Sequence, residues 1–250
     1  MIKSPIVAPP EHIYPPDPWS IIEARYSQAY QRRAETVFAL SNGYLGVRGT
    51  FDEGRPVHSL GTFINGLYES RPIHYAEEAY GLASKGQTMI AVPDATVFRL
   101  NVDDEPLLFP VANCRAYRRE LDLRADTLCR DLIWSTPGGK HVHVRTSRLV
   151  SLDQRHLLVI DYRITMLDRP APVVIRTGLT GTQSGHHGSG ETGASTLVDP
   201  RLAKVFEHQV LCEELRREDG RRLLMGYRAA NSGMTLGVGA YPHHRDVLSL

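Results

Sequence analysis

Strict alternation between apolar and polar side chains is the feature that most limits how this chain can fold. It is clearest in the predicted strand 141–151, which begins with the alternating residues His141, Val142, His143, Val144 and Arg145. Because successive side chains of a β-strand point to opposite faces, this period of two is typical of a strand with one buried face. One face carries Val142, Val144 and Thr146, and the opposite face carries His143, Arg145 and Ser147.

Similar patterns predict short strands along most of the chain, separated by turns such as Asp103-Asp104 and 137–139. Residues 19–26 fit a strand or a short helix, and residues 73–84, with alanines at helical spacing, favour a helix. Many short strands with few helical patterns indicate a mainly β fold, a large antiparallel β-sandwich (super-sandwich) with few short helices. The predicted strands are 56–68, 88–92, 96–102, 115–123, 127–135, 141–151, 156–165, 171–177, 205–217, 223–228 and 234–241.

Residues 35–54, ETVFALSNGYLGVRGTFDEG, carry the strongest hairpin signal. Asn42-Gly43 separates two apolar runs, 37–40 and 44–47. An Asn-Gly pair accepts the positive φ angles that a tight two-residue turn requires, so we predict a hairpin here. The two later glycines of the stretch are placed on the return strand, where glycine marks a bulge or the close approach of another backbone.

Composition excludes several classes of function. The 250 residues carry 29 basic and 28 acidic side chains, and a net charge of +1 gives no sign of a nucleic-acid or anionic-membrane surface. No segment approaches the roughly 18 apolar residues of a membrane helix, and the amino terminus lacks the apolar core of a signal peptide. Cys114, Cys129 and Cys212 are odd in number and widely spaced, which favours reduced, mostly buried thiols in a cytoplasmic protein.

Two further segments, at 1–18 and 181–195, are predicted to be neither strand nor helix. Residues 1–18 are rich in proline and predict an extended arm on the surface. Residues 181–195 are small and polar, which predicts a flexible loop between strands. We therefore divide the chain into a proline-rich arm, 1–18, and a β-sandwich domain, 19–250.

Further motifs follow the hairpin stretch in order. After 35–54 come GTFINGLY at 61–68, RELDLR at 119–124, LCR at 128–130 with Trp134, and RLVSL at 148–152 with His156. This series resembles the amino-terminal domain of glycoside hydrolase family 65, which contains maltose, kojibiose, nigerose and trehalose phosphorylases and acid trehalases. The resemblance runs from about Trp19 to about Thr165 and fades beyond Leu179.

The resemblance implies that the catalytic glutamate and the phosphate site lie in a helical barrel, which is absent from this chain. Inversion needs the acid and the attacking phosphate, or water, on opposite faces of the sugar, so one pocket must hold both. We assign to this chain no catalytic residue and no cofactor, with inorganic phosphate only as co-substrate of a parent phosphorylase. The acidic residues Glu35, Asp52 and Glu53 are interpreted as structural.

The hairpin is expected to meet the barrel near the rim of its active site. The residues assigned to this substrate or domain interface are Asn42, Gly43, Tyr44, Arg48 and Glu53. Tyr44 offers a rigid, half-apolar contact, and Arg48 a planar donor fork for a carbonyl or a carboxylate. The alternative is that Arg48 pairs inside the sandwich, for example with Asp52 or Glu53, and only stiffens the turn.

Histidine pairs and other aromatic residues give weaker indications of a site. His186-His187 and His243-His244 lack a full set of zinc ligands at short spacing, with Glu191 near the first pair, so we predict no metal site. Trp134 ends an apolar run and is expected in the core. The other aromatic residues considered for stacking on a sugar are Tyr44, Tyr68, Tyr75 and Tyr80.

Three functions remain open from the sequence. The first is a non-catalytic amino-terminal domain of an inverting phosphorylase or glycosidase that acts on α-linked glucosyl disaccharides. It would support the helical barrel of the same parent chain, contribute to homodimer packing and be inactive alone. The second is a free-standing carbohydrate-binding module, and the third is a β scaffold with no sugar contact.

Overall fold

The computed structural model consists of two compact units, each built mainly of β-strands. The first unit comprises Met1–Val57 and Phe98–Arg176, and the second comprises His58–Val97 and Thr177–Leu250. The residues that the structure describes are 8–53, 61–73, 75, 79–109, 111–179 and 210–244.

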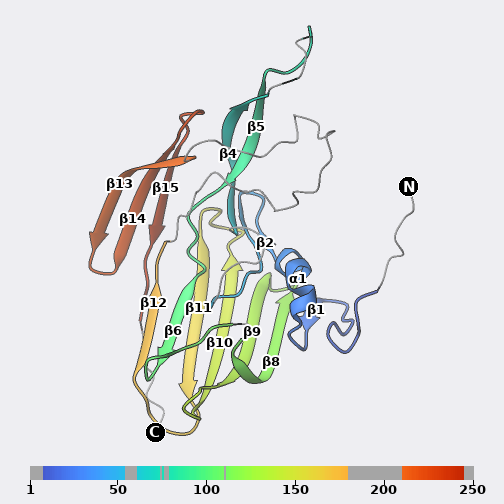
Figure 1. The fold of residues 1–250 in the computed structure, drawn as a ribbon, viewed down its shortest axis with the longest axis vertical. Helices are drawn as coiled ribbons and strands as arrows, with labels where there is room; N and C mark the ends of the chain where they lie inside the picture. The colour runs from blue at the N-terminus through green and yellow to red at the C-terminus, as the bar shows by residue number, and fades with distance from the viewer. Residues whose placement is uncertain are drawn as a thin grey trace. The chain divides into compact units, whose positions relative to one another are not determined.

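A five-stranded antiparallel sheet is the largest element of the first unit, and its strands can be followed side by side in Figure 1. Val142, Val144 and Thr146 are buried on its inner face, while the residues between them are half-buried or exposed, so the predicted alternation is confirmed. The strands, in sheet order, are β1 (Ser20–Glu23), β8 (Asn113–Asp122), β9 (Thr127–Ser135), β10 (His141–Val150) and β11 (Leu158–Met166).

A second, three-stranded sheet contributes to the same core. Its order is β12 (Val173–Thr177), β6 (Phe98–Val102) and β7 (Glu105–Pro106), with the predicted turn at Asp103-Asp104 between β6 and β7. Trp134, expected in the core, is only 2% exposed. Its cluster draws on both sheets, which confirms a mainly β, sandwich-like fold with short helical segments. The cluster is Phe51, Leu100, Val102, Leu107, Phe109, Leu132, Trp134, Val142 and Val144.

The predicted hairpin is present but shorter than expected. β2 (Leu40–Ser41) pairs with β3 (Leu45–Val47), and Gly43 has a φ of 85° at the turn. The run 37–40 is not all strand, because α1 (Gln31–Val37) extends to its first residue, after the 3-10 helix η1 (Gln28–Tyr30). The helix was missed because its buried face, Gln31, Ala34 and Glu35, has helical spacing but is mostly polar.

The second unit contains a long hairpin and a three-stranded sheet. β4 (Thr62–Pro72) pairs with β5 (Lys85–Ala91), and the sheet order is β13 (Leu211–Asp219), β14 (Arg222–Ala229), β15 (Thr235–Ala240). The fully buried carboxylate of Glu69 on β4 accepts hydrogen bonds from the backbone of Asn231 and Ser232, at 2.9 and 2.7 Å. The unit's core cluster is Leu67, Ile90, Val92, Val210, Leu211, Met225, Tyr227 and Ala229.

Two expectations are corrected. No helix occupies the described part of 73–84. Pro72 ends β4, Lys85 starts β5, and Gly81 takes a φ of 91° that a helix does not allow. All three cysteines are free thiols, but Cys114 and Cys129 are only half-buried and Cys212 is exposed, and of the three Cys114 packs against the core cluster of the first unit. The predicted loop at 181–195 lies outside the described residues.

Candidate functional site

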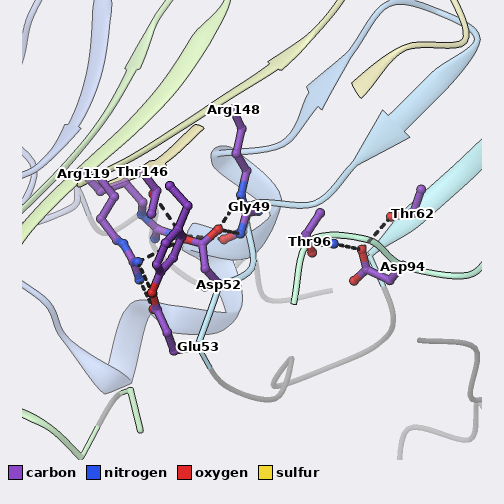
Figure 2. A network of polar contacts seen from close by, with 11 residues as sticks. Gly49, Asp52, Glu53, Thr62, Asp94, Thr96, Arg119, Thr146 and Arg148 are labelled. Atoms are coloured by element: carbon purple, nitrogen blue, oxygen red, sulfur yellow. Dashed lines mark hydrogen bonds and ion pairs between the residues drawn. The ribbon is translucent and has the colours of Figure 1, made fainter. Parts of the chain in front are cut away.

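Residues 49–53, which follow the hairpin, are bound to the inner face of the five-stranded sheet. We call them the clamped segment. Gly49 supplies a backbone carbonyl, and Asp52 and Glu53 supply carboxylates, all three facing arginines of the sheet. Figure 2 shows Gly49, Asp52 and Glu53 within the network of hydrogen bonds and ion pairs that joins this segment to the sheet.

Five residues form one row across the sheet, which we call the polar row. The strand registers place Glu23 opposite Arg119, Arg119 opposite Arg130, Arg130 opposite Thr146, and Thr146 opposite Tyr162. One residue comes from each of β1, β8, β9, β10 and β11, and the chain therefore assembles the row only when all five strands pair in register.

Asp52 of the clamped segment is held by β9 and β10. Its Oδ1 accepts from Nε of Arg148 at 3.0 Å and also from Nη2, while its Oδ2 accepts from the Thr146 hydroxyl at 3.2 Å. Nη2 of Arg130 lies 3.1 Å from Oδ2. Burial by itself would raise the pKa of Asp52, but the charges of Arg148 and Arg130 with these hydrogen bonds lower that pKa below its usual value.

Glu53 is held by three donors and is 1% exposed. Arg130 donates to it through a two-pronged pair, Nη1 to Oε2 at 2.6 Å and Nη2 to Oε1 at 2.7 Å. The Tyr162 hydroxyl also donates to Oε1. Burial, followed by the charge of Glu53, raises the pKa of Tyr162 well above its usual value, so this hydroxyl keeps its proton and remains a donor.

Glu23 and Arg119 complete the row at its other end. Nε of Arg119 donates to Glu23 at 3.0 Å, and Tyr117 donates to the same carboxylate oxygen at 2.6 Å. Nη1 of Arg119 donates to the Gly49 carbonyl at 2.8 Å. The Arg119 guanidinium also lies over the Phe38 and Phe51 rings, 4.2 and 4.6 Å from their centres, so its charge is shielded from water on several sides.

Gly49 is required by packing within the first unit. A Cβ at this position would lie 2.5 Å from Cβ of Phe38 and 2.7 Å from the Phe38 carbonyl oxygen. The neighbouring Arg48 points inward, with Nη2 3.5 Å from a carboxylate oxygen of buried Glu35 and 3.4 Å from the Thr36 hydroxyl. The partner of Arg48 is thus on α1, and not Asp52 or Glu53 as considered from the sequence.

The hairpin tip is the exposed part of the stretch. Asn42 donates from Nδ2 to the carbonyls of Ser151 and Arg155, at 2.6 and 3.0 Å, and so fixes the tip to the β10–β11 turn. Half-buried Tyr44 meets the ring of exposed His156 edge-on, with 4.5 Å between ring centres, and the Arg155 guanidinium lies 5.1 Å from the Tyr44 ring centre. Gly43 is exposed at the turn.

The buried carboxylates of this site are unsuited to acid–base catalysis. Asp52 and Glu53 already accept bonds at both oxygens, and an inverting glycosidase needs two groups with a sugar between them. The cavity beside Asp52 has space for about one water molecule. The arrangement can join the clamped segment to the sheet, but it cannot admit a disaccharide.

The structure divides the predicted interface residues into two groups. Asn42, Gly43 and Tyr44 lie at the tip, whereas Arg48 and Glu53 are turned inward. Arg119, Arg130 and Arg148 were not predicted from the sequence as the partners of the clamped segment. The signal was available for two of them, because the alternation that buries Val142, Val144 and Thr146 continues to Arg148, and Leu128 and Leu132 flank Arg130 with the same period.

The other sequence candidates do not gather into a second site. Tyr80 is exposed, while Tyr68 and Tyr75 are half-buried. Across the described ranges there is no group of three metal-binding side chains, and the His186-His187 pair and Glu191 fall outside those ranges. None of the helices that the structure describes has the length and apolarity needed to cross a membrane.

Comparison with known proteins gives consistent results. The profile of "Glycosyl hydrolase family 65, N-terminal domain" matches residues 21–245, well beyond the residues that carried the resemblance. An uncharacterised glycosyl hydrolase of Mycobacterium tuberculosis is 35% identical over 92% of the chain. The α,α-trehalose phosphorylase of Thermoanaerobacter brockii is 33% identical over 79%, and the kojibiose phosphorylase of Escherichia coli 29% identical over 82%.

These relatives are much longer than the chain, which spans 28%, 26% and 24% of their respective lengths. Among solved structures, a candidate kojibiose phosphorylase from the human microbiome superposes with a TM-score of 0.71 at 20% identity. The match covers 92% of the chain and 28% of that protein, and it supports the fold.

Proposed function

Because the chain belongs to glycosyl hydrolase family 65, as an N-terminal domain of that family, we propose that it is a non-catalytic part of a disaccharide phosphorylase or glycosidase. Its role is to support a helical catalytic barrel in the same parent protein. One observation carries the proposal: Asp52 and Glu53, two of the three acidic residues of the hairpin stretch, are buried and bonded to arginines, beside a cavity too small for a sugar.

The proposed contact with the barrel is the hairpin tip. Tyr44 presents a half-buried ring flanked by Arg155 and His156, and Asn42 fixes this group to the β10–β11 turn. Arg48 and Glu53 are not part of this contact. Their inward bonds hold the hairpin and the clamped segment in place. Inorganic phosphate and an α-linked disaccharide are then ligands of the parent protein. Homodimer packing and a cytoplasmic location complete the proposal, the latter supported by three free thiols.

The proposal is tested with the purified 250-residue chain. Incubation with maltose, kojibiose or trehalose, with and without inorganic phosphate, should release neither glucose nor glucose 1-phosphate above a blank. The kojibiose phosphorylase of Escherichia coli serves as the positive control. Product formation by the pure chain would overturn the non-catalytic assignment.

A free-standing carbohydrate-binding module is the second candidate, and it is favoured by the half-buried Tyr44 ring beside exposed His156 at the tip. Calorimetric titration with the same sugars separates the two. We expect no saturable heat, because a single half-buried tyrosine gives one stacking face and no enclosed cleft. Saturable binding that is lost in Tyr44→Ala would favour the module instead.

A further inference from the structure

A small cavity lies between the clamped segment and the sheet. It is lined by three buried arginines, by Asp52, and by two threonines and two apolar residues. The lining residues are Thr50, Phe51, Asp52, Arg119, Leu128, Arg130, Thr146 and Arg148. Three guanidinium groups with a single carboxylate make this an unusual lining for a protein interior, where charged groups normally find partners.

Arg130 and Arg148, which line this cavity, each keep one donor atom without a hydrogen bond. Nε of Arg130 and Nη1 of Arg148 are buried and have no partner among the described residues, although both side chains are no more than 3% exposed. The neighbouring carboxylates of Asp52 and Glu53 accept instead from other nitrogens of the same two arginines and from the hydroxyls of Thr146 and Tyr162. Unbonded buried donors are destabilising, and an acceptor in the cavity would remove that penalty.

We propose that the cavity is a binding site for one small hydrogen-bond acceptor, a water oxygen or a halide ion, bridging Arg130 and Arg148. The space allows about one water molecule. Charge balance makes water the expected occupant, since Glu23, Asp52 and Glu53 already offset Arg119, Arg130 and Arg148. The bound acceptor links β9 to β10 directly beneath the clamped segment.

Crystals of the 250-residue chain test the site and identify its occupant. They are grown in two conditions, halide-free sodium acetate and sodium bromide, with anomalous data collected at the bromine edge. A peak within hydrogen-bond distance of both Arg130 Nε and Arg148 Nη1 in both conditions, without anomalous signal, supports the site with water as its ligand. A bromine anomalous peak there supports it with a halide. Absence of any peak in both conditions overturns the proposal.

A variant that fills the cavity provides the second readout. Leu128→Phe adds volume to the cavity wall and should displace the ligand and its peak, whereas Leu132→Phe, on the same face of β9 but outside the lining, should retain it. A peak that persists in Leu128→Phe would contradict the placement. If Leu128→Phe does not fold, the two conditions with the unmodified chain still decide the matter.

Discussion

At the scale of single residues, the first unit is unusual for the charge it buries. Asp52, Glu53, Arg130 and Arg148 are each nearly inaccessible to solvent, yet every carboxylate oxygen has a donor. Replacing such a network by apolar residues can be neutral, but removing one member leaves the others charged and unpaired. The network therefore favours the observed arrangement of the clamped segment, in which both carboxylates have donors.

Arg130→Met should be strongly destabilising. Arg130 contacts both Asp52 and Glu53, so the substitution removes the main partner of one buried carboxylate and a second partner of the other. We expect the free energy of unfolding in urea to fall by about 3–5 kcal/mol. Arg118→Met is the matched control, because Arg118 pairs with Glu120 at the surface and should leave the midpoint nearly unchanged. Equal effects of the two substitutions would contradict a buried network.

Stability should also fall in acid. The folded state lowers the pKa of Asp52, so unfolding leads to proton uptake at pH values between the folded and unfolded pKa values. The contribution is complete above the unfolded pKa of about 3.9 and is lost as pH falls through the folded pKa. Urea unfolding measured at successive pH values below about 5 should show a shallower slope for Asp52→Asn than for the unmodified chain. Identical slopes would rule out Asp52 as a major source of the acid sensitivity.

At the scale of elements, Gly49 decides how closely the clamped segment approaches α1. The Gly49 amide donates to the Glu35 carbonyl at 2.8 Å, and the following residues reach the sheet only because no side chain separates this backbone from Phe38. The clamped segment also accepts two main-chain hydrogen bonds. The Phe98 amide donates to the Asp52 carbonyl at 2.8 Å, and the Phe109 amide donates to the Glu53 carbonyl at 3.2 Å.

Gly49→Ala and Gly46→Ala form a matched pair of tests. A methyl group at 49 would lie 2.5–2.8 Å from Phe38 atoms, two of them backbone, whereas one at 46 would meet only Ser41 at 3.8 Å or more. Gly49→Ala should therefore lower the free energy of unfolding by roughly 1–3 kcal/mol, and Gly46→Ala should have little effect. If thermal melting showed the two variants to be alike, the close approach of α1 and the clamped segment would be wrong.

The same elements show what could be predicted from the sequence. The Asn42-Gly43 turn and the alternation of β10 were readable because turn chemistry and strand period are local properties. The polar row was not, because it depends on the register of five strands, one of which, β1, is distant in the chain from the other four. The buried face of α1 was missed for a different reason: Gln31 and Glu35 are polar residues buried beside polar partners, Tyr26 and Arg48, which the periodicity of apolar residues does not reveal.

At the scale of the whole molecule, the tip and the clamped segment have different tasks. The segment's polar groups are directed inward, and those of the tip lie at the surface of the first unit. The chain spans about a quarter of the length of its curated phosphorylase relatives, so the proposed parent protein has ample further sequence to cover the tip. A change at the tip should accordingly leave the stability of the 250-residue chain intact. It should lower activity only in a parent protein that contains the further sequence.

Tyr44→Ala tests this division. In the 250-residue chain, the substitution removes contacts with Arg155 and His156 at the surface and should leave the melting temperature almost unchanged. In a parent protein that includes the catalytic barrel, loss of an aromatic anchor from a buried contact should weaken docking and lower turnover by roughly ten-fold. Tyr80→Ala is the control, because Tyr80 is exposed and should affect neither measurement. Collapse of the 250-residue Tyr44→Ala chain would make the tip an internal structural element. Unchanged turnover in the parent would show that the barrel does not contact Tyr44.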